Sequence, residues 1–166
     1  MTEEAMRTDL HAEAFFTADH AVVESGKLYV NGGAWNRVAY PSYPAVQAVG
    51  VAAVLHIPWR AHNQSHAFLI EFEDADGLKM PARLEGHFQA SLPADARAGD
   101  YSVLPVSVMV NGFVFQRPGE YAAVLSVDGT EISRWRWRAV QTVGVPGAIP
   151  LDSPTSPPGS EPPPAE

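Results

Sequence analysis

Apolar and polar side chains alternate with a period of two residues along much of the chain, which is the pattern of half-buried β-strands. The clearest stretch runs from Phe113 to Val140 and predicts a β-hairpin. Its first strand places the apolar side chains of Tyr121 and Leu125 on one face, and Asp128-Gly129 supplies a strong turn signal. This hairpin indicates an all-β fold.

The return strand of the hairpin reads RWRWR, so its tryptophans and its arginines must lie on opposite faces. A two-residue turn would place the arginines on the core face, where an unpaired charge is costly. We therefore expect a three-residue loop over Val127–Gly129, with Gly129 in the left-handed conformation. In that register Tyr121 lies opposite Trp135, and both Trp135 and Trp137 join the core.

The arginine face of the same strand is a candidate surface for an anion or a partner, formed by Arg134, Arg136 and Arg138. An interleaved strip of arginines and aromatic rings would suit nucleic acid. That interpretation is disfavoured because the two residue types face opposite ways and because the rest of the chain is acidic. A solvated arginine row behind core tryptophans is the favoured interpretation.

Further stretches predict the remaining strands, and two of them carry irregularities. Gly32-Gly33 indicates a bulge or bend, and Pro81 indicates an edge strand, since proline cannot donate to a ladder. The expected strands are 14–23, 28–40, 46–57, 66–73, 78–89 and 102–110. With the hairpin they make about eight strands and predict an antiparallel β-sandwich, either jelly-roll or immunoglobulin-like.

Composition divides the chain into three parts. We expect a flexible arm over residues 1–11, one β-sandwich domain over 12–143 and a disordered, proline-rich tail over 144–166. The tail could serve as a proline-rich ligand, but it lacks a PxxP motif beside a basic residue. A solvated terminus is therefore favoured.

Charge and cysteine content narrow the function classes. The formal net charge of -8 argues against nucleic acid or an acidic membrane as a partner. The chain has no cysteine and no signal-peptide pattern, so we expect a cytoplasmic protein. Most of its basic residues are arginine, which together with the alanine and proline usage suggests a bacterial source.

Several segments together resemble an uncharacterised bacterial family of small β-sandwich proteins, a domain of unknown function. The matching segments are AFFTADHAVVESGKLYVNGGAWNRV, YPSYP, FLIEFEDADG and FQRPGEYAAVLSVDG. The resemblance covers Phe15 to Val140 and rests on turn and core signatures. It implies a β-sandwich, and it implies no catalytic residue.

A metal site is one candidate for chemistry. His62, His66 and Glu71, with His87 as a further ligand, resemble a degraded cupin pattern, in which histidines and a glutamate bind a metal. The histidine spacing is H-x-x-x-H where cupins have H-x-H, and the later histidine is missing. Histidines around a surface loop are the favoured alternative.

Two further features could bind a ligand, but we favour a purely structural role for each. The acidic segment Glu71–Asp76 could hold calcium, but D-x-D-G is equally an ordinary hairpin turn. Aromatic residues beside prolines, among them Trp59 and Tyr43, could form the base of a sugar-binding or peptide-binding site, although core packing and loop anchoring explain most such residues.

No catalytic residue and no cofactor site is predicted. The sequence favours a non-catalytic binding or assembly module that acts through protein contacts, with a protein partner or a second copy of the chain as its ligand. The alternative is a cupin-like metal-dependent enzyme or a binder of small ligands or carbohydrate.

Overall fold

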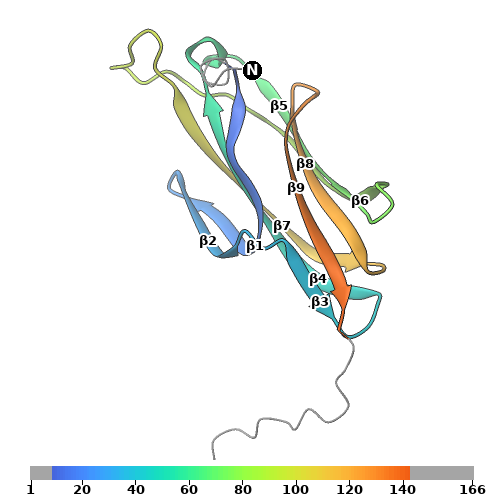
Figure 1. The fold of residues 1–166 in the computed structure, drawn as a ribbon. Helices are drawn as coiled ribbons and strands as arrows, with labels where there is room; N and C mark the ends of the chain where they lie inside the picture. The colour runs from blue at the N-terminus through green and yellow to red at the C-terminus, as the bar shows by residue number, and fades with distance from the viewer. Residues whose placement is uncertain (1–8, 143–166) are drawn as a thin grey trace, which may run out of the picture.

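A computed structural model describes residues 9–142, and over this range the chain forms two packed β-sheets (Figure 1). The predicted tail and most of the predicted arm lie outside the described residues. Within them, nine strands and one short 3-10 turn are present. The strands are β1 (His11–Glu24), β2 (Lys27–Gly33), β3 (Arg37–Tyr40), β4 (Ala45–Ile57), β5 (His66–Glu73), β6 (Lys79–Phe88), β7 (Ser102–Phe115), β8 (Gly119–Val127) and β9 (Thr130–Gln141).

The order of the strands distinguishes the two predicted sandwich types. One sheet has the order β2-β1-β4-β7 and the other the order β3-β9-β8-β5-β6. In the first sheet, β1, β4 and β7 correspond to strands A, B and E of an immunoglobulin-like sandwich. In the second sheet, β9, β8 and β5 correspond to strands G, F and C, and β6 is added beyond strand C. β3 pairs in parallel with β9, whereas every other pair is antiparallel among the described strands. The predicted sandwich is confirmed, and its topology is the immunoglobulin-like alternative.

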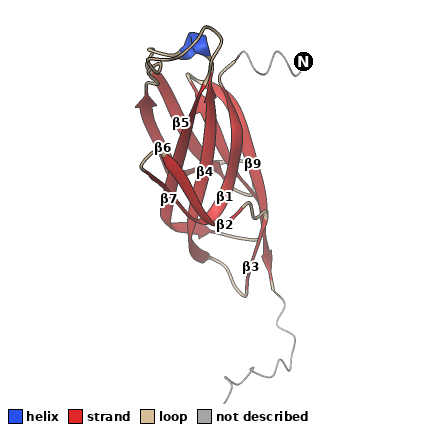
Figure 2. Ribbon diagram, turned by 90° about the vertical axis from the view of Figure 1, so that its left-hand side faces the viewer, coloured by secondary structure: helices blue, strands red, loops and turns tan. Residues whose placement is uncertain are grey.

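The helix η1 (Trp59–Ala61) follows β4 at one end of the sandwich, which is the upper end in Figure 2, and β3 lies near the other end. None of the described residues belongs to a helix long and apolar enough to cross a bilayer.

Most strand predictions are confirmed, and three boundaries differ. The first strand begins at His11 rather than at Ala14, so it includes the last residue of the predicted arm. The expected strand 28–40 is divided into β2 and β3, which belong to different sheets. The break follows Gly32, whose φ is +59° and where a Cβ would lie 2.1 Å from the Asp19 carboxylate. Conversely, β7 continues past the expected end at Val110, because a bulge with Gly112 at φ +77° keeps it paired with β4.

The register of the β8–β9 hairpin corrects our loop prediction. Val127 pairs with Thr130 across a two-residue turn, in which Asp128 and Gly129 both have positive φ. The extra residue lies further along β9, at Ile132, because Ser126 pairs with Glu131 but Leu125 pairs with Ser133. The bulge turns the arginines outward, as the cost of burying charge requires.

As a consequence of that bulge, Tyr121 lies opposite Trp137 rather than opposite Trp135. Trp137 is fully buried, and Trp135 is partly buried against the core. The prediction that both rings join the core is therefore confirmed, although the pairing partner was wrong.

The far half of β1 bends with β2 across the outer face of the first sheet. Gly50 of β4 permits this crossing, because a Cβ there would lie 3.0 Å from both the Ala18 carbonyl and the Met109 sulfur. A small second core of Ala18, Ala21 and Ala52 lies where β1 crosses β4. Small residues are required here because two backbones approach closely.

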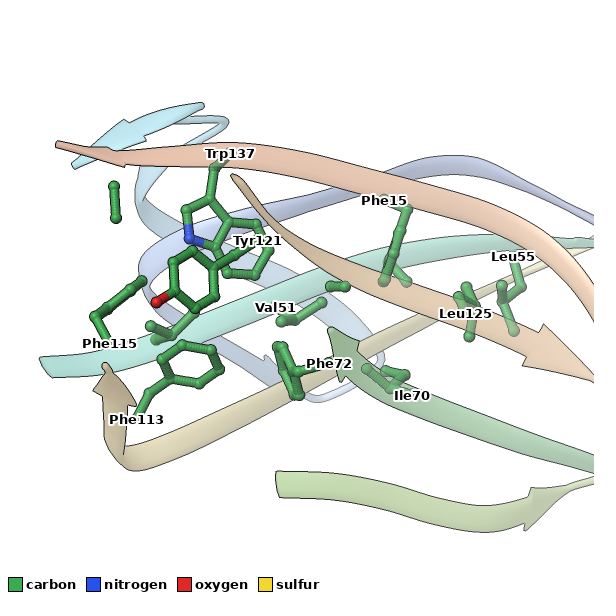
Figure 3. Packing of buried hydrophobic residues seen from close by; sticks show 14 of the residues in the cluster. Phe15, Val51, Leu55, Ile70, Phe72, Phe113, Phe115, Tyr121, Leu125 and Trp137 are labelled. Atoms are coloured by element: carbon green, nitrogen blue, oxygen red, sulfur yellow. The ribbon is translucent and has the colours of Figure 1, made fainter. Parts of the chain in front are cut away.

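The main core lies between the sheets and is aromatic at one end (Figure 3). Phe113 and Phe115 of β7 lie against Tyr121 and Trp137, with ring centroids 4.8 to 6.3 Å apart. Leu55 and Leu125 fill the core toward the other end (Figure 3). Aromatic rings contribute large buried areas and favourable edge contacts, so this end is tightly packed.

Hydrogen bonds from tyrosines fix the backbone at the aromatic end. The Tyr121 hydroxyl donates to the Arg117 carbonyl at 2.8 Å, four residues upstream, which is the tyrosine corner of immunoglobulin-like folds. The Tyr43 hydroxyl donates to Val140 O at 2.9 Å, and the Tyr43 ring meets Tyr40 edge-on. Burial, and then the neighbouring Tyr43, raise the pKa of Tyr40 to about 12.

Candidate functional site

The end of the sandwich opposite the aromatic cluster carries four histidines. His11 begins β1, His56 lies near the end of β4, His62 follows η1 and His66 begins β5. Three of them, His56, His62 and His66, are buried. Buried imidazoles must be hydrogen-bonded or ion-paired, so their partners define what this end can do.

Two of these histidines form a stack with Tyr101, which lies just before β7. The rings of His56 and Tyr101 have centroids 4.4 Å apart, and those of His56 and His11 have centroids 4.6 Å apart. Both pairs are within 20° of parallel. The arrangement follows from strand register, because His11 is directly opposite His56 in the β1–β4 ladder.

Glu13 lies beside the stack because it follows His11 by two residues on β1, and residues two apart on a strand share a face. The register shifts between Ala12 and Ala14, so Glu13 is the extra residue of a bulge. One oxygen, Glu13 Oε1, lies 3.3 Å from both His11 Nε2 and His56 Nδ1. These three side chains are the group among the described residues that offers converging ligands for a metal ion.

A pocket of about 580 Å³ opens beside this cluster. Trp59 is 37% exposed and Tyr101 60% exposed, so both rings are available at its rim. Its lining residues are Glu13, His56, Pro58, Trp59, Arg60, Gly99 and Tyr101. Trp59, which the sequence nominated, therefore lies at the pocket, and its binding of a sugar or a partner stays a prediction.

The predicted metal ligands are not brought together. His62 Nδ1 faces the Pro58 carbonyl at 3.0 Å, and its Nε2 lies 2.7 Å from the Ser102 hydroxyl. Glu71 instead pairs with Lys79 at 2.8 Å, and His87 is an exposed residue of β6. Metal binding by His62, His66 and Glu71 stays a prediction, and these contacts do not favour it.

His66 links three segments of the chain. Its Nδ1 lies 2.7 Å from Asp128 Oδ2, and its Nε2 lies 2.8 Å from the Ala61 carbonyl. Both ring nitrogens face acceptors, so both carry protons and neither offers a lone pair to a metal. The Asp128 carboxylate also accepts from the Ala67 amide at 2.9 Å, which ties the β8–β9 turn to β5.

These contacts shift the pKa values of the pair in opposite directions. Burial lowers the pKa of His66, but its hydrogen bonds to Asp128 and Ala61 and the Asp128 charge together raise it above the ordinary 6.5. The His66 hydrogen bond, and then that from Ala67, lower the pKa of Asp128 below its ordinary 3.8. Both shifts favour the charged pair and widen the pH range over which it persists.

The arginines of β9 lie on the outer face of the second sheet. Arg134 forms ion pairs with Glu73 and with Glu131, the latter at 2.9 Å, and these carboxylates raise the pKa of Arg134 further. Arg138 pairs with Glu120 at 2.8 Å, while Arg136 is exposed. Since two of the three charges face carboxylates, the strip has little free positive charge, and its role as a partner surface stays a prediction.

The remaining candidates have structural roles in the described chain. Asp74 Oδ1 accepts from the amides of Asp76 and Leu78, both at 2.9 Å, as expected for an ordinary turn. Tyr43 lies in the loop between β3 and β4, whereas Trp59 belongs to η1 at the opposite end of the sandwich (Figure 2), so the structure does not bring these two predicted ligand residues into one site.

A second surface is the free edge of β2. Its residues are mostly exposed, among them Tyr29, which is 51% exposed, and Val30. Tyr29 lies beside Val22 of β1, which is also exposed, because the two residues pair in the ladder. This edge therefore presents unpaired backbone groups together with apolar side chains.

Sequence reasoning missed His11, Glu13, His56 and Tyr101. His11 and Glu13 were placed in or beside the arm, and His56 was absorbed into an apolar strand. The usable signal was the H-x-E spacing, because residues two apart on a strand share a face, so His11 and Glu13 form a candidate ligand pair.

Comparison with known proteins places the chain in a family. A family of unknown function (DUF6941) matches residues 13–140, so the chain belongs to this family. This confirms the predicted membership of a family of unknown function, while the bacterial source stays a prediction. No curated protein matches the chain.

Proposed function

We propose that this domain is a non-catalytic binding and assembly module that acts through protein contacts, and that the free edge of β2 is its contact surface. The observation that supports the proposal is the lack of protection along this strand. Exposed edge strands pair readily with further strands unless charges, prolines, bulges or short length prevent it.

The other outer strands of the two sheets carry such protection. β3 has four residues, β6 contains Pro81 with Arg83 and Glu85, and β7 contains Pro105. β2 has seven residues, no proline, and a single charged side chain at its first residue, Lys27. Among the described edges, β2 is thus the one best suited to accept another strand.

The partner that we favour is a second copy of the chain. The chain carries a formal charge of -8, so two copies repel each other over most of their surfaces. β2 has no acidic residue, which lets two copies meet there without opposing carboxylates. Antiparallel pairing of β2 with β2 about a two-fold axis would join both four-stranded sheets into one.

Sedimentation velocity and native mass spectrometry of the full chain test this proposal. We expect a concentration-dependent dimer that Tyr29→Lys weakens at least about tenfold, because the new charge lies on the paired edge. Leu78→Lys is the matched control, since Leu78 is also an exposed apolar residue, lies in the β5–β6 turn and should leave the dimer intact. A monomer at all concentrations, or equal effects of both substitutions, would contradict the proposal.

A further inference from the structure

His11, Glu13 and His56 have the chemistry and the spacing of a metal-binding triad. Their ligand atoms all lie within 4.8 Å of one another, and Glu13 Oε1 is 3.3 Å from a nitrogen of each histidine. Zn–N and Zn–O bonds of about 2.0–2.1 Å in a tetrahedral site put neighbouring ligand atoms about 3.3 Å apart. The two carboxylate–imidazole distances are therefore those of two edges of such a site.

The tautomer of the His11 ring is set by the contact of its other nitrogen. His11 Nδ1 lies 2.7 Å from the Asp9 carbonyl, which can only accept, so Nδ1 carries the proton. In the neutral ring, Nε2 then has its lone pair directed toward Glu13. Metal-binding histidines commonly donate their second N–H to a backbone carbonyl in this way, which fixes both tautomer and ring orientation.

The segment that presents this carbonyl is held from outside the strand. The Asp9 side chain forms an ion pair with Arg60 of η1, so the start of β1 is tied to the turn that follows β4. The two strand ends that supply the three ligands are thereby joined both by the ladder and by this contact. Such support beyond the ligands themselves holds the backbone of the proposed site in place.

We propose that His11, Glu13 and His56 bind a divalent transition-metal ion, and that Zn²⁺ fits the site best. Two imidazoles and one carboxylate suit Zn²⁺ and its neighbours, whereas Ca²⁺ and Mg²⁺ require mostly oxygen ligands. Three protein ligands leave one tetrahedral position open. Glu13 and His56 also line the pocket beside Trp59 and Tyr101, from which water or an anionic group can complete the coordination.

Binding requires one ring to turn. An imidazole binds a metal in its ring plane, but the His11 and His56 rings are stacked with planes 19° apart. For both lone pairs to converge on one ion, His56 must rotate away from Tyr101, its other stacking partner. Metal binding should therefore change the surroundings of Trp59 and Tyr101 at the pocket.

The proposal is tested on the full chain, without a polyhistidine tag and freed of metal by chelation. Isothermal titration with Zn²⁺ should show one ion per chain, and Co²⁺ should give the visible absorption of a tetrahedral complex. Glu13→Gln and His11→Gln should each weaken Zn²⁺ binding at least about tenfold. Both side chains are at least partly exposed, so neither variant is expected to unfold the domain.

Two control variants separate this site from other histidines. His20→Gln removes an exposed histidine of β1 outside the triad, and Glu71→Gln removes the carboxylate of the site predicted from sequence; both should bind as the wild type does. Absence of saturable binding would overturn the proposal, as would equal binding by wild type and Glu13→Gln, or loss of binding in Glu71→Gln. The triad is distant from β2 Tyr29, so Tyr29→Lys should not affect the titration, and the two proposals fail separately.

Discussion

The two ends of this sandwich are built from different side chains, although the same strands reach both. At one end Phe113, Phe115, Tyr121 and Trp137 pack ring against ring between the sheets. At the other end, buried or half-buried histidines contact carboxylates and backbone carbonyls. Apolar rings gain stability wherever they are buried, whereas imidazoles require specific partners. We therefore expect the aromatic end to contribute more to the free energy of unfolding. The histidine end carries the side chains that can bind a ligand or titrate.

The largest expected effect is at the aromatic end. Trp137→Ala should reduce the free energy of unfolding by about 3–5 kcal/mol, because it leaves a cavity among the surrounding rings. Urea unfolding followed by circular dichroism measures the loss. Trp59→Ala, at the exposed pocket rim of the other end, should change it by less than about 0.5 kcal/mol. Similar losses in both variants would remove the distinction between the ends.

If Trp137→Ala does not fold, Trp137→Phe gives a smaller and informative change. The Trp137 Nε1–H is buried and has no hydrogen-bond partner among the described residues. Phenylalanine removes this unsatisfied donor along with part of the ring, so it should cost clearly less than alanine. An equal cost for both would mean that the ring does not support the core as described.

The next effect concerns the tyrosine corner. Tyr121→Phe keeps the buried ring but removes the hydroxyl that donates to Arg117 O, so the carbonyl loses its partner. We expect a loss of about 1–2 kcal/mol in the free energy of unfolding, measured by the same urea titration. The matched change Tyr29→Phe on the exposed β2 edge should have no measurable effect on a monomeric sample, and a comparable loss there would contradict the assignment.

The smallest effect is at the histidine end and depends on pH. Because the pKa of His66 is raised in the folded state, its contribution is complete below about pH 6.5 and is lost as pH rises through the folded value. Because the pKa of Asp128 is lowered, its contribution is complete above about pH 3.8 and is lost as pH falls through the folded value. The pair stabilises most between these limits.

Asp128→Asn measures this contribution. Asparagine tolerates the positive φ of the turn as well as aspartate does, so the backbone is unchanged. The variant should be less stable than wild type by about 1 kcal/mol near pH 5, since Asp128 is half exposed and screened by solvent, and the difference should shrink as pH rises through the folded pKa of His66. His87 also acts on Asp128, so the titration is compared with that of His87→Gln. A difference independent of pH would contradict the ion pair.

The fold could largely be predicted from the sequence, because each strand has its own local pattern of alternating apolar and polar residues. The β5 bounds, the edge position of β6 and the outward arginines follow from alternation, Pro81 and the cost of burying charge. The bulge at Ile132 could not be placed, because one extra residue in either the turn or β9 turns the arginines outward, and the sequence constrains only the face that they take.

The histidine site was less accessible to sequence reasoning. His11 and His56 meet only because β1 pairs with β4, a pairing that spans the whole β2–β3 segment, and Glu13 lies beside them because it follows His11 by two residues on the same strand. Local patterns carry no information about such pairing. By contrast, His62, His66 and Glu71 are close in sequence, yet strand direction and competing partners keep them in separate networks.

The parallel pairing of β3 with β9 has a consequence for how the chain folds. Residues of the two segments meet across long separations, as in the hydrogen bond from Trp135 Nε1 to Trp35 O, 100 residues earlier. Contacts between such distant residues repay the entropy of loop closure only late, so we expect folding on the millisecond-to-second scale typical of β-sandwiches. During synthesis β3 cannot pair with β9 until β9 has been translated. The early strands must therefore remain soluble through that interval, which places a kinetic demand on the N-terminal half that the finished structure no longer reveals.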